Sequence, residues 1–127
     1  MSKKKRSKPK TGMRLYRDVL GLKQTELADA FGVSEGTYRQ WENNPVEAWL
    51  RLACKGYAFC LRAGVDDCAW TGGQLVDARN RMNMTQDDLA LALSLHRSTI
   101  GRYEAGTPPR WMSFAVMALA FDVAPAP

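Results

Sequence analysis

The sequence predicts an all-helical protein built from two similar units in tandem, and three observations support this fold class. The chain repeats itself at an interval of 62 residues, so that Trp49 aligns with Trp111, and the alignment needs no gap from Met13 to Leu61. Apolar residues recur three or four positions apart, which is helical spacing. N-capping residues, glycines and prolines divide this pattern into short helices. Positions identical in both copies are expected to share a structural role, whereas positions that differ can give each copy its own specificity.

The first copy predicts four helices separated by recognisable turn signals. Gly32 tolerates a positive φ at the corner after the second helix, and Ser34 is suited to cap the third helix. The helices are expected near Arg14–Leu20, Gln24–Phe31, Ser34–Asn43 and Pro45–Leu61.

The second copy repeats this plan with different turn residues. Its apolar pattern breaks near Asn83, and Thr85 with Asp88 forms an N-capping pair in which an acidic residue replaces the usual Glu or Gln. Ser94 stands where the first copy has a glycine, which is a more strained choice for a corner. The helices are expected near Leu75–Met82, Gln86–Ser94, His96–Ala105 and Arg110–Val123.

The repeat also sets the expected domain boundaries: residues 1–12 as an arm, 13–62 as the first unit, 63–72 as a linker and 73–124 as the second unit. A connection of about ten residues can span up to about 35 Å, so rigid packing between the units is not required. The fourth helices are nevertheless more apolar than a four-helix core should absorb. We therefore expect a copy-to-copy or chain-to-chain interface, such as a homodimer through the fourth helices. The recurrence of Trp49 and Trp111 favours core packing over a partner surface for these two side chains.

The positive charge of the chain is concentrated at its N-terminus. The net charge is +5, yet the first ten residues carry six basic side chains and the remaining residues sum to −1. Such a segment cannot bury enough apolar surface to fold, so we expect a disordered basic arm that contacts nucleic acid, with a role in solubility alone as the alternative. The basic residues are Lys3, Lys4, Lys5, Arg6, Lys8 and Lys10.

Composition also excludes several classes of protein. No apolar run is long enough to span a membrane, and the basic start is not followed by the apolar core of a signal peptide, so we expect a cytoplasmic protein without membrane contact. Cys54, Cys60 and Cys68 lack CxxC spacing, and His96 is the one histidine, so packed, reduced thiols are expected rather than a metal site. No nucleophile or carboxylate cluster is visible. We therefore expect no enzymatic activity, cofactor, metal or small-molecule ligand.

The second and third predicted helices of each copy have the helix-turn-helix layout. The shared pattern is an Arg, six residues, a Gln, then Leu-Ala-x-Ala, an apolar pair around a small turn residue, and a Thr, an apolar residue and a final Glu. This pattern resembles the lambda repressor and Cro type of helix-turn-helix domain. The second copy, which ends in Arg102–Gly106, is more similar, because the first has Asn43 and Asn44 where the family usually has a glycine. The resemblance implies binding to double-stranded DNA.

The resemblance also implies structural roles. Gln24 and Gln86 are similar to the family glutamine that grips a phosphate and braces the recognition helix. Two ion pairs between the first and third helices are implied, without a part in base readout: Arg17 with Glu42, and Arg79 with Glu104. The implied core residues are Leu27, Ala28, Ala30, Val33, Tyr38 and Trp41 with their counterparts Leu89, Ala90, Ala92, Leu95, Ile100 and Tyr103.

Exposed positions on the third helices are the predicted base readers, and the two copies differ there. They are Glu35, Gly36, Thr37, Arg39 and Gln40 in the first copy, and Arg97, Ser98, Thr99, Gly101 and Arg102 in the second. Arginine suits guanine, glutamine suits adenine, and glutamate accepts from the cytosine amino group, so unlike half-sites are expected. His96 is expected either to contact the DNA, most simply a phosphate, or to replace the Ser34 cap.

These features indicate a sequence-specific transcription regulator, namely a small phage- or plasmid-type (auto)repressor that binds operator DNA through recognition helices 34–43 and 96–105 and occludes a promoter. The alternative is a protein-binding inhibitor or adaptor of the anti-defence or antitoxin kind on the same scaffold. Glu35 and the modest charge outside the arm favour the alternative, whereas the arm and the paired glutamines oppose it. Because the readers are unequal, a symmetric operator for one chain is not expected, and palindromy would come from pairing two chains.

Overall fold

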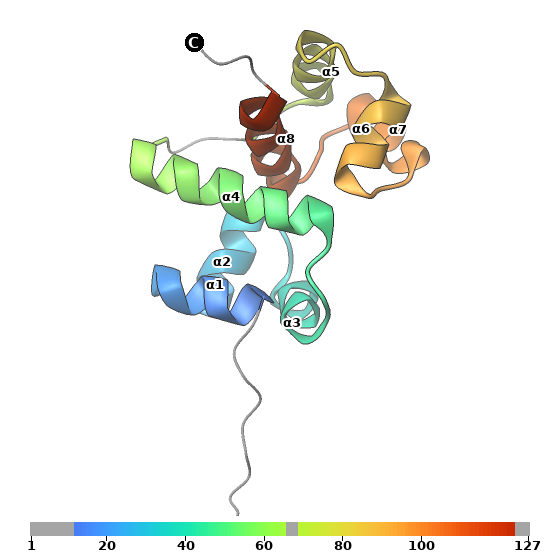
Figure 1. Cartoon of the computed structure of the whole chain (residues 1–127). Helices are drawn as coiled ribbons and strands as arrows, with labels where there is room; N and C mark the ends of the chain where they lie inside the picture. Colours follow the sequence, from blue (N-terminus) through green and yellow to red (C-terminus); the bar gives the residue numbers. More distant parts are fainter. Residues whose placement is uncertain (1–11, 66–68, 124–127) are drawn as a thin grey trace, which may run out of the picture.

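The computed structural model describes residues 12–65 and 69–123, and these residues form eight helices and no strand. Figure 1 shows α1 to α3 on one side of the crossing between α4 and α8, and α5 to α7 on the other. The expected all-helical fold with two tandem units is confirmed, while the basic arm lies outside the described residues. The helices are α1 (Gly12–Leu20), α2 (Gln24–Phe31), α3 (Glu35–Asn43), α4 (Ala48–Ala63), α5 (Gly72–Arg81), α6 (Gln86–Leu93), α7 (Arg97–Ala105) and α8 (Arg110–Val123).

Helix α3 in the first unit and helix α6 in the second begin at side-chain caps. Ser34 Oγ accepts a hydrogen bond of 3.1 Å from the Thr37 amide at the start of α3. At the start of α6, Thr85 and Asp88 exchange two hydrogen bonds of 3.0 Å, each from the backbone amide of one residue to the side chain of the other. These bonds satisfy amides that a helix N-terminus leaves without partners, and both caps are as predicted.

The corners between helices use left-handed backbone conformations in both units. Gly21 and Gly32 have φ of 71° and 73° in the first unit, and their counterparts Asn83 and Ser94 have φ of 59° and 57°. A side chain in this region costs roughly 1–2 kcal/mol, less for Asn. The backbone strain expected at Ser94 is therefore present, and Asn83 also has a left-handed backbone, at a lower cost.

Two boundaries differ by three residues from those predicted, and the others by two or fewer. Helix α4 begins at Ala48 rather than Pro45, because Glu47 has an extended backbone, φ −83° and ψ 167°, and so cannot lie inside a helix. A proline also forces the residue before it out of the helical region. Asn44 is accordingly extended, with φ −126° and ψ 159°, and Glu47 takes the N-cap position. Helix α5 begins at Gly72, the last residue of the predicted linker, where Thr71 and Gln74 form a capping box.

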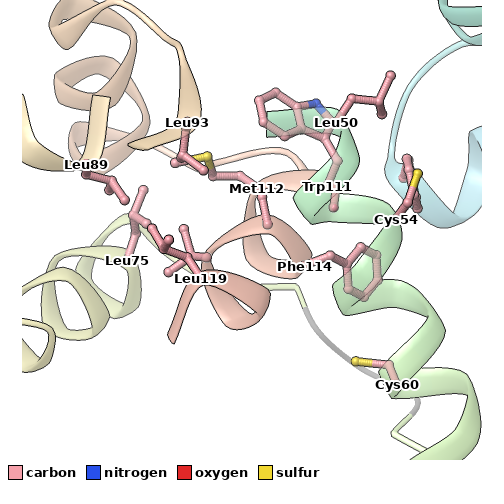
Figure 2. Close-up of a cluster of buried hydrophobic side chains, with 14 of the residues drawn as sticks. Leu50, Cys54, Cys60, Leu75, Leu89, Leu93, Trp111, Met112, Phe114 and Leu119 are labelled. Carbon is pink, nitrogen blue, oxygen red and sulfur yellow. The ribbon is translucent and has the colours of Figure 1, made fainter. Parts of the chain in front are cut away.

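The two units share one hydrophobic core, which is centred on the contact between α4 and α8. Figure 2 shows Leu50, Cys54 and Cys60 on α4 beside Trp111 and Phe114 on α8. The predicted copy-to-copy interface is confirmed, so the connection between the units does not leave them independent. A homodimer through the fourth helices remains a prediction. Such a homodimer could use the large apolar side chains that are exposed among the described residues of α4 and α8, which are Phe59, Leu61 and Phe121.

Candidate nucleic-acid interface

A three-residue brace ties α3 to the two helices before it. Arg17 Nε of α1 lies 2.6 Å from Glu42 Oε2 near the end of α3. Gln24 Nε2, at the first position of α2, donates to Glu42 Oε1 at 2.9 Å. One carboxylate therefore fixes the relative positions of three helices.

The second unit contains the same brace with nearly the same dimensions. Arg79 Nε lies 2.6 Å from Glu104 Oε2, and Gln86 Nε2 donates to Glu104 Oε1 at 2.8 Å. Arg79 Nη1 also donates to the Met84 carbonyl oxygen at 2.9 Å, which secures the turn between α5 and α6. The structure thus brings together both arginine–glutamate pairs implied by the sequence resemblance.

The two brace carboxylates are almost completely buried, with 5% and 6% of the Glu42 and Glu104 side chains exposed. Burial raises the pKa of Glu42, but hydrogen bonds from Arg17, Tyr38 and Gln24 outweigh it and hold the pKa below its ordinary value. The pKa of Glu104 is likewise lowered, since bonds to its arginine and glutamine outweigh burial. Both groups are therefore ionised at neutral pH.

Gln24 and Gln86 lie where they can serve the brace and a ligand at once. Each is partly buried at the first position of its helix and gives an Nε2–H to the brace carboxylate. A carboxamide nitrogen carries two hydrogens, so each glutamine keeps a second N–H, and its contact with a phosphate oxygen remains a prediction. The helix N-terminus adds a favourable field for an anion there.

In the first unit, the predicted readers partly neutralise one another. Arg39 Nη1 lies 3.0 Å from Glu35 Oε2 on successive turns of α3, and both side chains are about half exposed. Exposed pairs of this kind contribute roughly 0.2–1 kcal/mol, so a competing acceptor can separate them. Gly36 and Gln40 are exposed, whereas the Thr37 hydroxyl is engaged by Ser34 Oγ at 3.0 Å.

In the second unit, the readers are less constrained. Arg97 Nε lies 3.6 Å from Asp87 Oδ1 on α6, with 66% and 71% of these side chains exposed. The Arg102 guanidinium lies 5.6 Å from the centre of the Tyr103 ring. Ser98 is exposed on the same helix, and Thr99 and Gly101 are partly covered.

His96 occupies the N-cap position of α7 with an extended backbone, φ −73° and ψ 144°, but its side chain makes no capping hydrogen bond. The imidazole is therefore not a functional replacement for the Ser34 hydroxyl. It is exposed beside the start of the recognition helix, and its contact with DNA remains a prediction.

Two charged residues beside the glutamines were missed by the sequence reasoning. Lys23 precedes Gln24 and helps line a shallow hollow that also includes Glu35. In the second unit the residue beside the glutamine is acidic and the residue at the start of the recognition helix is basic, because Asp87 on α6 faces Arg97 on α7. Both residues could have been found in the sequence, because they adjoin the two glutamines. The two units therefore differ around their recognition helices in charge as well as in side-chain type.

Other kinds of site find no support in the described part of the chain. Residues 12–65 and 69–123 contain no group of three or more His, Cys, Asp or Glu side chains that could hold a metal ion. No helix in the same residues is long and apolar enough to cross a membrane. Cys54 and Cys60 are buried, and burial raises the pKa of the Cys54 thiol to about 12. Cys68 lies outside the described residues.

The braced pairs α2–α3 and α6–α7 define a helix-turn-helix DNA-binding fold. The family model described as Helix-turn-helix matches residues 13–51 and 75–125. The chain belongs to this lambda repressor-like helix-turn-helix family of DNA-binding regulators, whose members are typically not enzymes. No curated protein and no solved structure matches the chain.

Proposed function

We propose that the protein is a cytoplasmic, sequence-specific transcription regulator of the small phage or plasmid type that represses by occupying a promoter. One observation carries this proposal. The same arginine–glutamate–glutamine brace recurs in both units beneath recognition helices whose outward residues differ. A repeated scaffold under varied outward side chains is what readout of two DNA sequences requires.

The charges on α7 favour DNA over a protein partner. Arg97 and Arg102 are both exposed on this helix, and Arg97 Nε is separated from its acidic neighbour, Asp87 Oδ1, by 3.6 Å. A guanidinium can donate two hydrogen bonds to guanine O6 and N7 in the major groove. Gln86 and His96 lie beside the start of the same helix, and we propose that both contact phosphates.

A protein-binding adaptor is the second candidate, and the first unit supports it. There the Arg39 charge is compensated by Glu35 at 3.0 Å, so α3 attracts phosphates less strongly than α7 does. Under this alternative α3 would contact a partner protein. In the leading proposal, Glu35 instead accepts from a cytosine amino group and Arg39 is released toward the DNA.

Selection of bound sequences from a random DNA pool, followed by a salt titration on the selected duplex, tests the proposal. We expect one enriched sequence and an affinity that falls steeply with salt, because each phosphate contact releases about 0.9 of a counterion. Failure to enrich any sequence would contradict DNA readout and favour the adaptor. In transcription from a promoter that contains the selected site, added protein should lower transcript yield. An increase would argue for activation.

We also propose that the basic arm contacts phosphates. Deletion of residues 2–10 removes all six of its basic side chains: Lys3, Lys4, Lys5, Arg6, Lys8 and Lys10. The deletion should lower affinity and flatten the salt dependence while leaving the selected sequence unchanged, because phosphate contacts carry no direct sequence information. A changed selected sequence would instead show that the arm reads bases.

A further inference from the structure

Equivalent residues of the two repeats meet each other across the α4–α8 interface. The rings of Trp49 and Trp111, which are 62 positions apart, have centroids 4.5 Å from each other. Phe59 and Phe121, separated by the same interval, have centroids 4.7 Å apart. Contacts between equivalent positions arise where a two-fold axis passes through an interface.

The helices around this contact are arranged reciprocally. Helix α4 of the first unit packs against α6 of the second, and α8 of the second unit packs against α2 of the first. In a two-fold interface, a contact from i to j is matched by a contact from j to i. The internal interface therefore has the organisation of a homodimer interface, with both halves supplied by one chain (Figure 1).

An aromatic path joins the two recognition helices through this axis. Trp41 of α3 lies 5.4 Å from Trp49, Trp49 lies 4.5 Å from Trp111, and Trp111 lies 5.8 Å from Tyr103 of α7, all between ring centroids. Trp41 and Tyr103 are themselves equivalent positions, so the path is the same in both directions. Close-packed rings are nearly incompressible, so this chain of contacts fixes the position of α3 relative to α7.

We propose that a single chain binds one duplex as an internal dimer, with α3 and α7 in successive major grooves over two inverted but unlike half-sites. The inference rests on the proposed DNA-binding function and names the form of its target. Two-fold-related readers require inverted half-sites about one helical turn, ~34 Å, apart. The charge reversal between Glu35 and Arg97 makes the half-sites unequal. The sequence alone suggested that inverted half-sites would require two paired chains, whereas here one chain supplies both recognition helices.

The test uses the full chain on its selected duplex. Native mass spectrometry should find one chain of 14.2 kDa per duplex, and the selected sequence should contain two inverted half-sites that differ from each other. Two chains per duplex, a direct repeat or a single half-site would each overturn the inference. Absence of any selected sequence would instead contradict the proposed function, so the two failures are distinguishable.

Spacing provides a second test. Five base pairs inserted between the half-sites turn one of them to the opposite face of the duplex, because a helical turn is about 10 base pairs. A rigid internal dimer then loses one half-site, and affinity should fall by about tenfold or more. The same five base pairs inserted outside the site form the control and should have no effect. Retained affinity with the internal insertion would show independently tethered units and would overturn the inference.

Discussion

Gly56 of α4 lies so close to Phe114 of α8 that a β-carbon at position 56 would come within 2.7 Å of the Phe114 carbonyl carbon and overlap its oxygen. The obstacle is backbone, which cannot rotate aside as a side chain can. This contact sets how closely the two fourth helices approach, and with it the geometry of the interface between the repeats.

We predict that Gly56→Ala destabilises the protein by about 1–3 kcal/mol, because the added methyl group overpacks the interface and must force α4 away from α8. Chemical denaturation measures the free energy of unfolding. Gly73→Ala is the matched control, since its β-carbon would meet the nearest atom, Thr71 Oγ1, at an ordinary 3.8 Å. Equal destabilisation by the two variants would show that the Gly56 contact does not set how closely α4 and α8 approach.

The buried brace predicts a specific dependence of stability on pH. The pKa of Glu104 is lowered in the folded protein, where burial is outweighed by the hydrogen bonds from Arg79 and Gln86. Its contribution to stability is therefore complete above the ordinary glutamate pKa and is lost as pH falls through the lowered folded-state value. We predict that Glu104→Gln costs about 1.5–3 kcal/mol at pH 7, the range for hydrogen bonds to a charged group.

The measurement is the free energy of unfolding at pH 7 and pH 3 for the wild type, Glu104→Gln and Asp29→Asn, a control that removes an exposed carboxylate. The difference between wild type and Glu104→Gln should shrink at the lower pH, because the unfolded chain then binds a proton at Glu104 that the folded brace disfavours. If the difference is the same at both pH values, the charge of Glu104 contributes nothing to the brace.

Ser113 is a polar residue that stability alone does not favour. It is fully buried in α8, and its Oγ finds no hydrogen-bond partner among the described residues. We predict that Ser113→Ala is neutral or stabilises by up to about 1 kcal/mol, because the desolvation penalty disappears. The reverse change at a buried alanine of the same helix, Ala118→Ser, should destabilise. Destabilisation by Ser113→Ala would show that the hydroxyl has a partner.

Much of the local structure could be predicted because its causes are local. The caps at Ser34 and Thr85 follow from residues three positions apart, and α8 has its predicted bounds. The start of α4 was wrong because Glu47 is not a preferred capping residue and Pro45 is compatible with a first helical turn. Residue preferences for helix termini therefore could not distinguish a start of α4 at Pro45 from one at Ala48.

The interface between the repeats was predictable only in outline. Surplus apolar surface on the fourth helices indicated that something covers them, but which surface covers which depends on three-dimensional packing. One usable signal was Gly56 together with its counterpart Ala118, because small residues at equivalent positions allow two helices to approach closely. The pairing of Arg97 with Asp87 was hidden for the same reason, since it joins two different helices.

Methylation interference on the selected duplex tests the central claim, that α3 and α7 read DNA bases, most directly. Methylation of guanine N7 blocks the major-groove acceptor that arginine uses. We predict interference in both half-sites for the wild type. Arg97→Ala and Arg102→Ala should each cost about 1–3 kcal/mol of discrimination and abolish interference in one half only. Arg81→Ala, which removes an exposed arginine of α5, is the control and should change nothing. Interference that is absent, or unchanged by both α7 substitutions, would contradict the account.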